Sequence, residues 1–420
     1  MDTEIRELKS RIILDSRGNP TIESEVYTVK GFGRASAPSG LSTSAYEVPH
    51  IPEGGPRKVL EILTREIFPK LKGLDSSNQA FFDSQLKELD GTTNFSRIGG
   101  AAATSLSFAN AKAASNTLGL PLYKHLNNLG VYELPLPLGN VIGGGKHARD
   151  RSIPFQEILV FPLNPPTIFD AIMINVMVHK ELSKILSHID PYFAGGKNDE
   201  GAWVTKVTIE KALDAVNEAI KNVKSMINVP VEIGIGMDIA ASNLWYPDKK
   251  VYKYEDKVFT EDQHLNYMFS LIEKYQILYL EDPFHEDSFD TFAELTKIVK
   301  DYGTVIVGDD IFATRIDRLI EGINRKAGNG IIIKPNQVGT ISDAIKVIKY
   351  AREYGFTPIV SHRSGETTDE TIAHLAVAYQ VPIIKTGTVG GERISKLNEL
   401  IRIEELDNNI KPAFIYRMKK

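Results

Sequence analysis

The chain has 420 residues, a formal net charge of −5 at pH 7 and no cysteine. This length exceeds the size at which single hydrophobic cores stop growing, so we expect two domains. The negative charge argues against a nucleic-acid partner, and the absence of cysteine excludes disulfides, thiolate catalysis and cysteine-ligated metals. No segment approaches the ~18 consecutive apolar residues of a membrane helix, and residues 1–10 lack a signal-peptide core. We therefore expect a soluble cytoplasmic protein without a membrane partner.

The first third of the chain predicts a small α+β domain. Two strand-like runs, IRELKSRIIL and TIESEVYTV, are joined by the turn-forming sequence DSRGNP. Helical periodicity follows in three segments, residues 57–67, 78–89 and 100–118. The proline-punctuated run LPLPLGN at residues 134–140 leads into a second domain. We place the boundary near residue 132, so that the predicted domains are 1–132 and 133–420.

Three segments rich in glycine and small polar residues lack strand or helix periodicity, and we expect them to act as lids. They are residues 37–45, 142–150 and 195–202. Loops of this composition can bring backbone amides close to an anion. None of them matches a phosphate-binding P-loop or a dinucleotide fingerprint, so nucleotide binding has no support.

Apolar, largely β-forming segments of the second half end abruptly in a charged residue. They are residues 233–238, 277–282, 305–310, 331–334, 358–363 and 382–385. Unbroken apolar runs are typical of buried parallel strands, and their regular spacing matches a strand, a loop and a covering helix. If these units close into a barrel, the strand-end side chains meet at the mouth where such barrels carry their chemistry. These side chains are Asp238, Glu281, Asp309, Lys334, His362 and Lys385.

The three carboxylates in this set, Asp238, Glu281 and Asp309, indicate a metal site. Acids on neighbouring strand ends repel one another and cannot all ionise easily without a cation. A donor set of oxygen atoms without histidine or cysteine suits Mg²⁺. The alternative is that each acid caps the helix that follows its strand.

Lys334 and Lys385 each allow two interpretations. A lysine at a buried strand end loses solvation, which lowers its pKa, and a nearby cation lowers that pKa further. A lysine in such a position can act as a general base. Alternatively, each forms a salt bridge with one of the acids.

The segment SHRSGET, residues 361–367, indicates an anion site. The planar guanidinium of Arg363 suits phosphate or carboxylate oxygens, and the hydroxyl of Ser364 supplements it beside His362. The competing interpretation is an arginine that bridges two loops. Gln156 and Glu157 begin another strand.

Glu200 lies in a glycine-rich loop. If Glu157 and Glu200 approach the same site they can share a proton, so that one carboxyl serves as a general acid. A solvated loop glutamate is the alternative for Glu200.

These motifs together resemble the enolase family, in family order and spacing over almost the whole chain. The matching motifs are ILDSRGNPT, LPLPLGNVIGGGKHA, QE at 156–157, GMDIAAS, LEDPF, VGDD, KPNQVGT, SHRSGET and KTG. KPNQ is similar to the form in archaeal members. The resemblance implies an α/β fold with an enolase-type β/α barrel and a smaller N-terminal α+β cap. It also implies a lyase that interconverts 2-phosphoglycerate and phosphoenolpyruvate in glycolysis and gluconeogenesis.

The resemblance further implies two Mg²⁺ ions in each active site. Asp238, Glu281 and Asp309 would bind the first with high affinity, while Ser42 would bind the second, which arrives with substrate, when its loop closes. Homologous enzymes assemble, so the resemblance implies a homodimer or an octamer of dimers.

Catalytic roles are implied for a second group of residues. Lys334 would remove the C2 proton, and Glu200, supported by Glu157, would assist departure of the C3 hydroxyl. His147 and Gln156 would shape the pocket.

Substrate binding is implied for a third group. Arg363 and Ser364 would hold the phosphate, His362 would line the site, and Lys385 would meet the carboxylate. Departures from the family pattern fall in the lid at 37–45 and the stretch 48–56 after it, in the loop at 195–203 and after Lys385. The altered lids leave open a paralogue with weak catalysis kept as a binding or structural protein. A second alternative is a proton-abstracting relative acting on another carboxylate. The phosphate-facing Arg363 weighs against the second.

Overall fold

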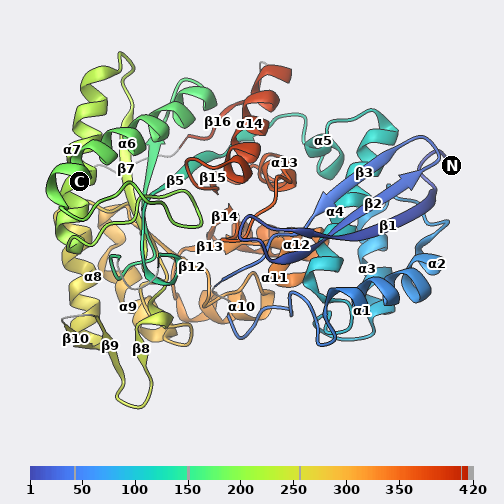
Figure 1. Ribbon diagram of the computed structural model, residues 1–420, viewed down its shortest axis with the longest axis horizontal. Coiled ribbons are helices and arrows are strands. Elements are labelled where there is room, and N and C mark those ends of the chain that lie inside the picture. Colours follow the sequence, from blue (N-terminus) through green and yellow to red (C-terminus); the bar gives the residue numbers. More distant parts are fainter. Residues whose placement is uncertain (42–43, 149–151, 255–256, 408, 415–420) are drawn as a thin grey trace.

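The computed structural model describes residues 1–41, 44–148, 152–254, 257–407 and 409–414. An α+β cap and a closed eight-stranded barrel lie at opposite ends of the long axis (Figure 1). The predicted fold class, an α/β barrel with a smaller N-terminal cap, is confirmed. The exact domain boundary stays a prediction.

The cap is an antiparallel three-stranded sheet covered by helices. Its strands are β1 (Ile5–Leu14), β2 (Pro20–Thr28) and β3 (Phe32–Ser36), in the order β1-β2-β3. Its helices are α1 (Gly55–Ile62), α2 (Phe68–Leu71), α3 (Gln79–Asp90), α4 (Gly99–Leu118) and α5 (Leu122–Leu126). The expected helix at 57–67 continues from α1 as a π-helical turn, Leu63–Ile67, and β3 was not predicted. The alanine-rich α4 is buried and packs on β2 and β3, because its small side chains allow close approach to the sheet.

The barrel contains the strands that the apolar runs predict, together with two earlier ones. Around the barrel they are β11 (Tyr279–Glu281), β12 (Val305–Gly308), β13 (Gly330–Ile333), β14 (Thr357–Ser361), β15 (Ile383–Lys385), β5 (Leu136–Gly143), β6 (Glu157–Leu163) and β7 (Glu232–Asp238). The short β4 (Glu133–Leu134) pairs with β16 (Lys411–Pro412) outside the barrel.

Strand β6 departs from the expected all-parallel arrangement. It is antiparallel to both β5 and β7, and its first residue, Glu157, lies beside Asp238 at the end of β7. A strand that runs in the opposite direction begins where its neighbours end. Gln156 and Glu157, which start a strand, therefore reach the same mouth as the residues that end the others.

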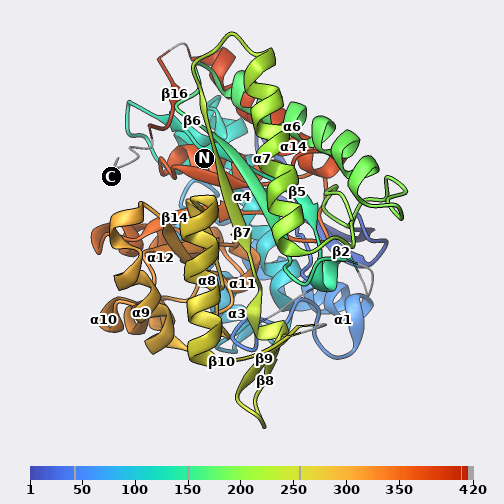
Figure 2. The same cartoon turned by 90° about the vertical axis from the view of Figure 1, so that its left-hand side faces the viewer.

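Helices surround the barrel and cover the outer faces of its strands (Figure 2). They are α6 (Ile168–Ile189), α7 (Ile209–Met226), α8 (Glu261–Tyr275), α9 (Phe289–Ile298), α10 (Ile316–Arg325), α11 (Pro335–Val338), α12 (Ile341–Glu353), α13 (Thr371–Ala378) and α14 (Gly391–Leu406). A small antiparallel sheet of β8 (Trp245–Tyr246), β9 (Val251–Lys253) and β10 (Val258–Thr260) projects from one side. Among the described residues, no helix combines the length and apolar character needed to traverse a bilayer.

The barrel interior is a packed apolar core. Its buried side chains include Leu138, Leu159, Phe161, Leu163, Leu278, Tyr279, Val307, Ile332, Ile359 and Ile383. The interior of a barrel this size is filled by side chains and leaves no pore. The polar site at the mouth therefore lies on top of a packed core, which separates it from the opposite end of the barrel.

Candidate active site

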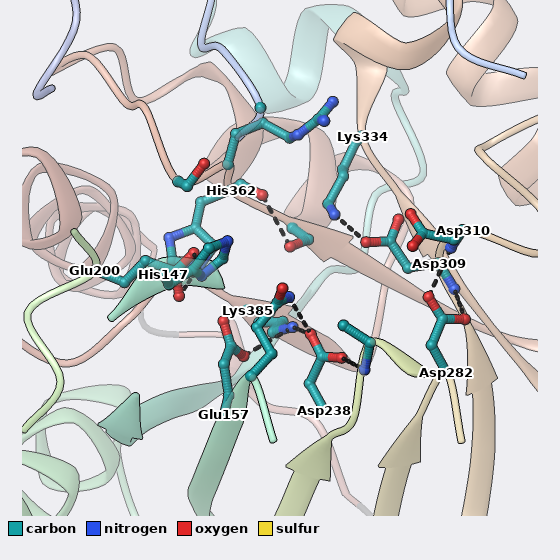
Figure 3. A pocket seen from close by; sticks show the side chains of 16 residues that line it. His147, Glu157, Glu200, Asp238, Asp282, Asp309, Asp310, Lys334, His362 and Lys385 are labelled. Carbon is teal, nitrogen blue, oxygen red and sulfur yellow. Dashed lines mark hydrogen bonds and ion pairs between the residues drawn. The ribbon is translucent and has the colours of Figure 1, made fainter. Parts of the chain in front are cut away.

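Polar side chains from the barrel, together with Gly40 of the cap, line one pocket at the mouth (Figure 3). The lining residues are Gly40, His147, Gln156, Glu157, Glu200, Asp238, Ala240, Asp282, Asp309, Asp310, Lys334, Ser361, His362, Arg363, Ser364 and Lys385. Five of the six strand-end side chains named from the sequence line this pocket. The sixth, Glu281, is not among the lining residues and accepts a hydrogen bond from Lys385.

Lys385 is at the centre of the acidic cluster. Its Nζ lies 2.8 Å from a carboxylate oxygen of Glu157, 2.9 Å from one of Asp238 and 2.7 Å from one of Glu281. Burial alone lowers the pKa of Lys385, but the charges of Asp238, Glu157 and Glu281 outweigh that effect and raise the pKa well above its usual value. Lys385 is therefore a fixed cation in this site, as the salt-bridge interpretation predicts.

Lys334 differs from the expectation of a lowered pKa. Its ammonium group bonds to Oδ2 of Asp309. Burial lowers the pKa of Lys334, yet the charge of Asp309 more than offsets burial, and the net direction is upward. Of the two interpretations of Lys334, the structure agrees with the salt bridge to an acid, and the expected lowering of its pKa was wrong.

The carboxylates are crowded enough to perturb one another. Burial and the charges of Asp238 and Asp309 raise the pKa of Glu281 to about 8. Two further acids, Asp282 and Asp310, were not picked out from the sequence. Burial, followed by the charges of neighbouring aspartates, raises the pKa of both well above the usual range.

Asp282 also fixes the adjoining loop. Its carboxylate accepts the backbone N–H groups of Asp309 at 2.9 Å and Asp310 at 2.7 Å. Oxygens of these three aspartates lie within 4.8 Å of one another. Only Asp309 belongs both to this group and to the predicted metal-binding triad. The mouth therefore contains more carboxylates that could bind a metal than the three predicted from the sequence.

The residues present fit a hard divalent cation. Oε1 of Glu281 is buried and has no hydrogen-bond partner among the described residues. The surrounding donors are carboxylate oxygens, and an oxygen-only set suits Mg²⁺ better than metals that prefer nitrogen or sulfur. A cation would also relieve the repulsion that raises the pKa of Glu281.

On the other side of the pocket, Glu157 and Glu200 form a coupled pair beside His147. Nδ1 of His147 lies 3.4 Å from Oε1 of Glu200, and Nδ2 of Asn140 donates to Oε2 at 3.0 Å. Burial and the charge of Glu200 raise the pKa of Glu157 well above its usual range. Although burial opposes it, the net shift of the Glu200 pKa is downward, because His147 and His362 face its carboxylate. Of this pair, Glu157 is therefore the carboxyl with the raised pKa.

Gln156 borders both halves of the pocket. Its Nε2 donates to Oδ2 of Asp238 at 3.0 Å, while its side-chain oxygen has no partner among the described residues. His362 lies nearby, with Nε2 at 3.8 Å from Oε2 of Glu200. Burial lowers the pKa of His362 well below its ordinary value, so the ring is neutral.

The predicted anion site is bonded to the cap. Arg363 forms a two-point contact with Glu47, whose Oε2 lies 2.8 Å from Nη1 and whose Oε1 lies 3.1 Å from Nη2. Nε2 of Gln337 donates to Oε1 of Glu47 at 3.2 Å. Arg363 thus bridges two loops, as the competing interpretation holds, while it also lines the pocket.

The cap and the SHRSGET segment are joined by backbone pairing. The N–H of Ser39 donates to the carbonyl of Gly365 at 2.6 Å, and the N–H of Gly365 donates to the carbonyl of Ser39 at 2.9 Å. The N–H of Leu41 donates to Oγ of Ser364 at 2.8 Å. The lid therefore begins next to the predicted phosphate site. Ser42, predicted as a ligand of the second metal, lies outside the described residues.

Sequence reasoning missed several polar residues of this site. They are Glu47, Asp282, Asp310, Gln337 and Arg393. Four of them lie inside or beside motifs that were recognised, namely LEDPF, VGDD, KPNQVGT and the GER that follows KTG. Attention to charged and amide side chains inside or beside those motifs, and not only at the strand ends, would have found these four.

Fold and site together define a capped α/β-barrel enzyme with two lysines at an acidic mouth that suits a divalent cation. Comparison with known protein families identifies the family within this class. The C-terminal TIM barrel domain of enolase matches residues 131–415, and the N-terminal domain of enolase matches residues 5–126. The chain belongs to the enolase family, whose members are hydro-lyases that dehydrate 2-phosphoglycerate to phosphoenolpyruvate.

Curated relatives from archaea cover nearly the whole chain. The enolase of Methanosphaera stadtmanae is 46% identical over 96% of this chain and 98% of its own length. The enolase of Methanothermobacter thermautotrophicus is 46% identical over 96% of this chain and 97% of its own. That of Archaeoglobus fulgidus is 47% identical with the same two coverages. The resemblance read from the motifs is confirmed.

Proposed function

We propose that this chain catalyses the reversible dehydration of 2-phosphoglycerate with Lys334 as the base and Glu200 as the group that assists the leaving hydroxyl. One observation carries the assignment of roles. Lys334 and Glu200 lie on different sides of the same pocket, with Lys385 between them (Figure 3). A substrate bound between the two can lose a proton to one side and a hydroxyl to the other.

The metal requirement is part of this proposal. Asp238, Glu281 and Asp309 would hold one Mg²⁺, and Ser42 would contribute to a second that enters with substrate. When bound, these ions supply positive charge next to the substrate carboxylate, which makes the C2 proton more acidic. The crowded carboxylates and the unpartnered oxygen of Glu281 support a divalent cation at this place.

Lys334 would accept the C2 proton at Nζ. In the metal-free protein this ammonium group is paired with Asp309, which is also a proposed ligand. A carboxylate engaged by a cation holds a neighbouring ammonium group less tightly, so the pKa of Lys334 would fall as the site fills.

Glu200 and Glu157 would handle the leaving hydroxyl together. The proton that the pair shares rests on Glu157, and Glu200 is the carboxylate nearer to His147. Transfer of that proton through Glu200 would deliver it to the C3 oxygen. His147 and Gln156 would hold the geometry of this side of the pocket.

Substrate anions would meet the cationic groups of the mouth. Arg363 and Ser364 would bind the phosphate, Lys385 would face the carboxylate, and His362 would line the space between them. Arg363 can form two parallel hydrogen bonds to phosphate oxygens. Glu47 already accepts hydrogen bonds from both Nη atoms of Arg363, so a phosphate there would share the guanidinium with Glu47 or replace it.

The alternative of a weakly catalytic paralogue is not favoured. Every proposed catalytic group within the described residues is present, and all are buried except Lys334, whose side chain is 11% exposed. Relatives named enolase match almost the full chain. A cytoplasmic location and assembly into a homodimer or an octamer of dimers stay predictions from the sequence.

The decisive experiment measures phosphoenolpyruvate formation from 2-phosphoglycerate by absorbance, with Mg²⁺ and in excess chelator. We expect activity that disappears with chelation and returns with Mg²⁺. Absence of product under saturating Mg²⁺ and substrate would refute the proposal.

A further inference from the structure

Arg393 is a fully buried cation that no part of the proposed mechanism uses. It lies near the start of α14 and its side chain is 0% exposed. Its Nη1 bonds to Nδ1 of His362 at 2.8 Å and also to the carbonyl oxygen of Arg363. Its Nη2 donates to the carbonyl oxygens of Ser364 at 2.6 Å and Asp199 at 2.9 Å.

These contacts join two loops that come from distant parts of the sequence. Arg363 and Ser364 belong to the proposed phosphate site, whereas Asp199 immediately precedes Glu200. One guanidinium therefore connects the phosphate side of the pocket to the acid side. A lysine has a single nitrogen and no fork, so it cannot reach these acceptors in the same way.

The contact with His362 fixes where the ring proton lies. An arginine has only donor groups, so Nδ1 of His362 must accept the hydrogen bond from Arg393. The neutral ring then carries its proton on Nε2, which is the atom that faces Oε2 of Glu200 at 3.8 Å. His362 is thereby restricted to offering a proton toward the carboxylate of Glu200.

Two glycines, which have no side chain, make room for the side chain of Arg393. A Cβ atom on Gly387 would lie 3.2 Å from the side chain of Arg393, and one on Gly390 would lie 3.3 Å from it. Both glycines have positive φ, +80° and +113°. The short link after KTG, one of the departures from the family pattern, thus turns back tightly around this arginine.

We propose that Arg393 is a positioning residue which locks His362 in its Nε2–H tautomer and holds the Glu200 loop against the phosphate loop. This inference rests on the proposed roles of Glu200 and His362. It predicts that Arg393 matters to departure of the C3 hydroxyl and not to removal of the C2 proton. Arg393 acts through its neighbours and does not line the pocket.

The tautomer is tested first in the unaltered protein. Nitrogen NMR of the ring, assigned by comparison with His362→Gln, should show Nδ1 unprotonated and Nε2 protonated in the neutral state. This measurement needs no activity, so it separates failure of the inference from failure of the proposed function. A proton on Nδ1 would overturn the inference.

The second test compares Arg393→Met and Arg393→Lys with Arg402→Met as the control. Arg402 lies on the same helix, but its side chain is 62% exposed. We measure exchange of the C2 proton with solvent deuterium and net dehydration in the same samples. Arg393→Met should keep exchange near its original rate and lose roughly 10- to 100-fold in dehydration, as supporting residues typically do.

Arg393→Lys should recover only part of that loss, and Arg402→Met should change neither rate. Equal losses of exchange and dehydration in Arg393→Lys, with a folded protein by circular dichroism, would contradict a specific role for Arg393. If Arg393→Met does not fold, the exchange and dehydration rates of Arg393→Lys, compared with those of Arg402→Met, test the inference instead.

Discussion

Glu47 and Arg363 pair through two hydrogen bonds at the junction of the cap and the barrel, with side chains that are only 7% and 3% exposed. Arg363 is also the group proposed to bind the substrate phosphate. Glu47 follows the lid at residues 37–45, so we expect its carboxylate and a bound phosphate to compete for one guanidinium. Opening of this pair would then link phosphate binding to the position of the segment that carries Glu47.

Glu47→Gln tests that competition. Loss of the negative charge should tighten binding of inorganic phosphate by roughly tenfold, equivalent to about 1.4 kcal/mol, because Arg363 no longer has an anionic partner. It should also destabilise the phosphate-free protein by on the order of 3 kcal/mol, since a buried charge is left uncompensated. Calorimetry with phosphate and thermal melts measure the two effects.

Glu53→Gln is the matched control, because Glu53 lies six residues after Glu47 in the same stretch of the cap but is exposed. It should leave both phosphate affinity and melting temperature unchanged. Phosphate binding that is no tighter in Glu47→Gln than in the parent would argue against the competition.

Gly365→Ala tests the backbone pairing between the cap and the SHRSGET segment. A Cβ there would lie 2.2 Å from Oγ of Ser39 and 2.5 Å from Oδ2 of Asp15, so the two chains must separate. We expect a loss of about 1–3 kcal/mol in stability, as for other overpacked sites, together with weaker phosphate binding. Gly391→Ala, where no atom lies within 4 Å of the added Cβ, should do neither.

Proton release on metal binding tests the crowding around Glu281. Its pKa of about 8 means that the carboxyl is largely protonated at pH 7 in the metal-free protein, whereas a bound cation requires the ionised form. Mg²⁺ affinity should therefore rise as pH increases toward about 8 and level off above it. Calorimetry in buffers of different ionisation enthalpy counts the protons; an equal heat in all buffers at pH 7 would be inconsistent with this picture.

Lys334→Ala and Glu200→Gln separate the proposed base from the proposed acid. Lys334→Ala should lose exchange of the C2 proton by about 10²- to 10⁴-fold, the usual contribution of a general base. Glu200→Gln should retain exchange while losing net dehydration. Lys346→Ala serves as the control, because that lysine is 71% exposed on α12. Undiminished exchange in Lys334→Ala would remove Lys334 from its role.

The sequence predicted the barrel because buried parallel strands have a distinctive pattern. The apolar runs ended in charged residues, and Asp238, Glu281 and Lys385 end β7, β11 and β15 in the structure. Strand direction is not encoded in such a run, which is why the antiparallel β6 was not foreseen. An apolar segment has the same composition whichever way it runs.

Interactions between distant segments were harder to foresee. The pairing of Glu47 with Arg363 joins residues 316 positions apart. Nothing in the sequence around either residue indicates that the other is its partner. The pKa of Lys334 was also misjudged, since burial and the charge of Asp309 act in opposite directions. Which effect is larger depends on their distance, and only the folded structure supplies it.

The position of Lys385 in the chain has a consequence for how the protein is made. β15 pairs with β5 and closes the barrel, with Lys385 beside Leu138. Asp238 and Glu281 precede Lys385 by 147 and 104 residues. At typical synthesis rates, Lys385 is therefore added roughly 5–20 s or longer after these two acids. Until then β5 and β14 are open sheet edges and the acids repel one another. Closure of the barrel and neutralisation of its acids thus depend on the same strand, and neither can take place before β15 has been synthesised.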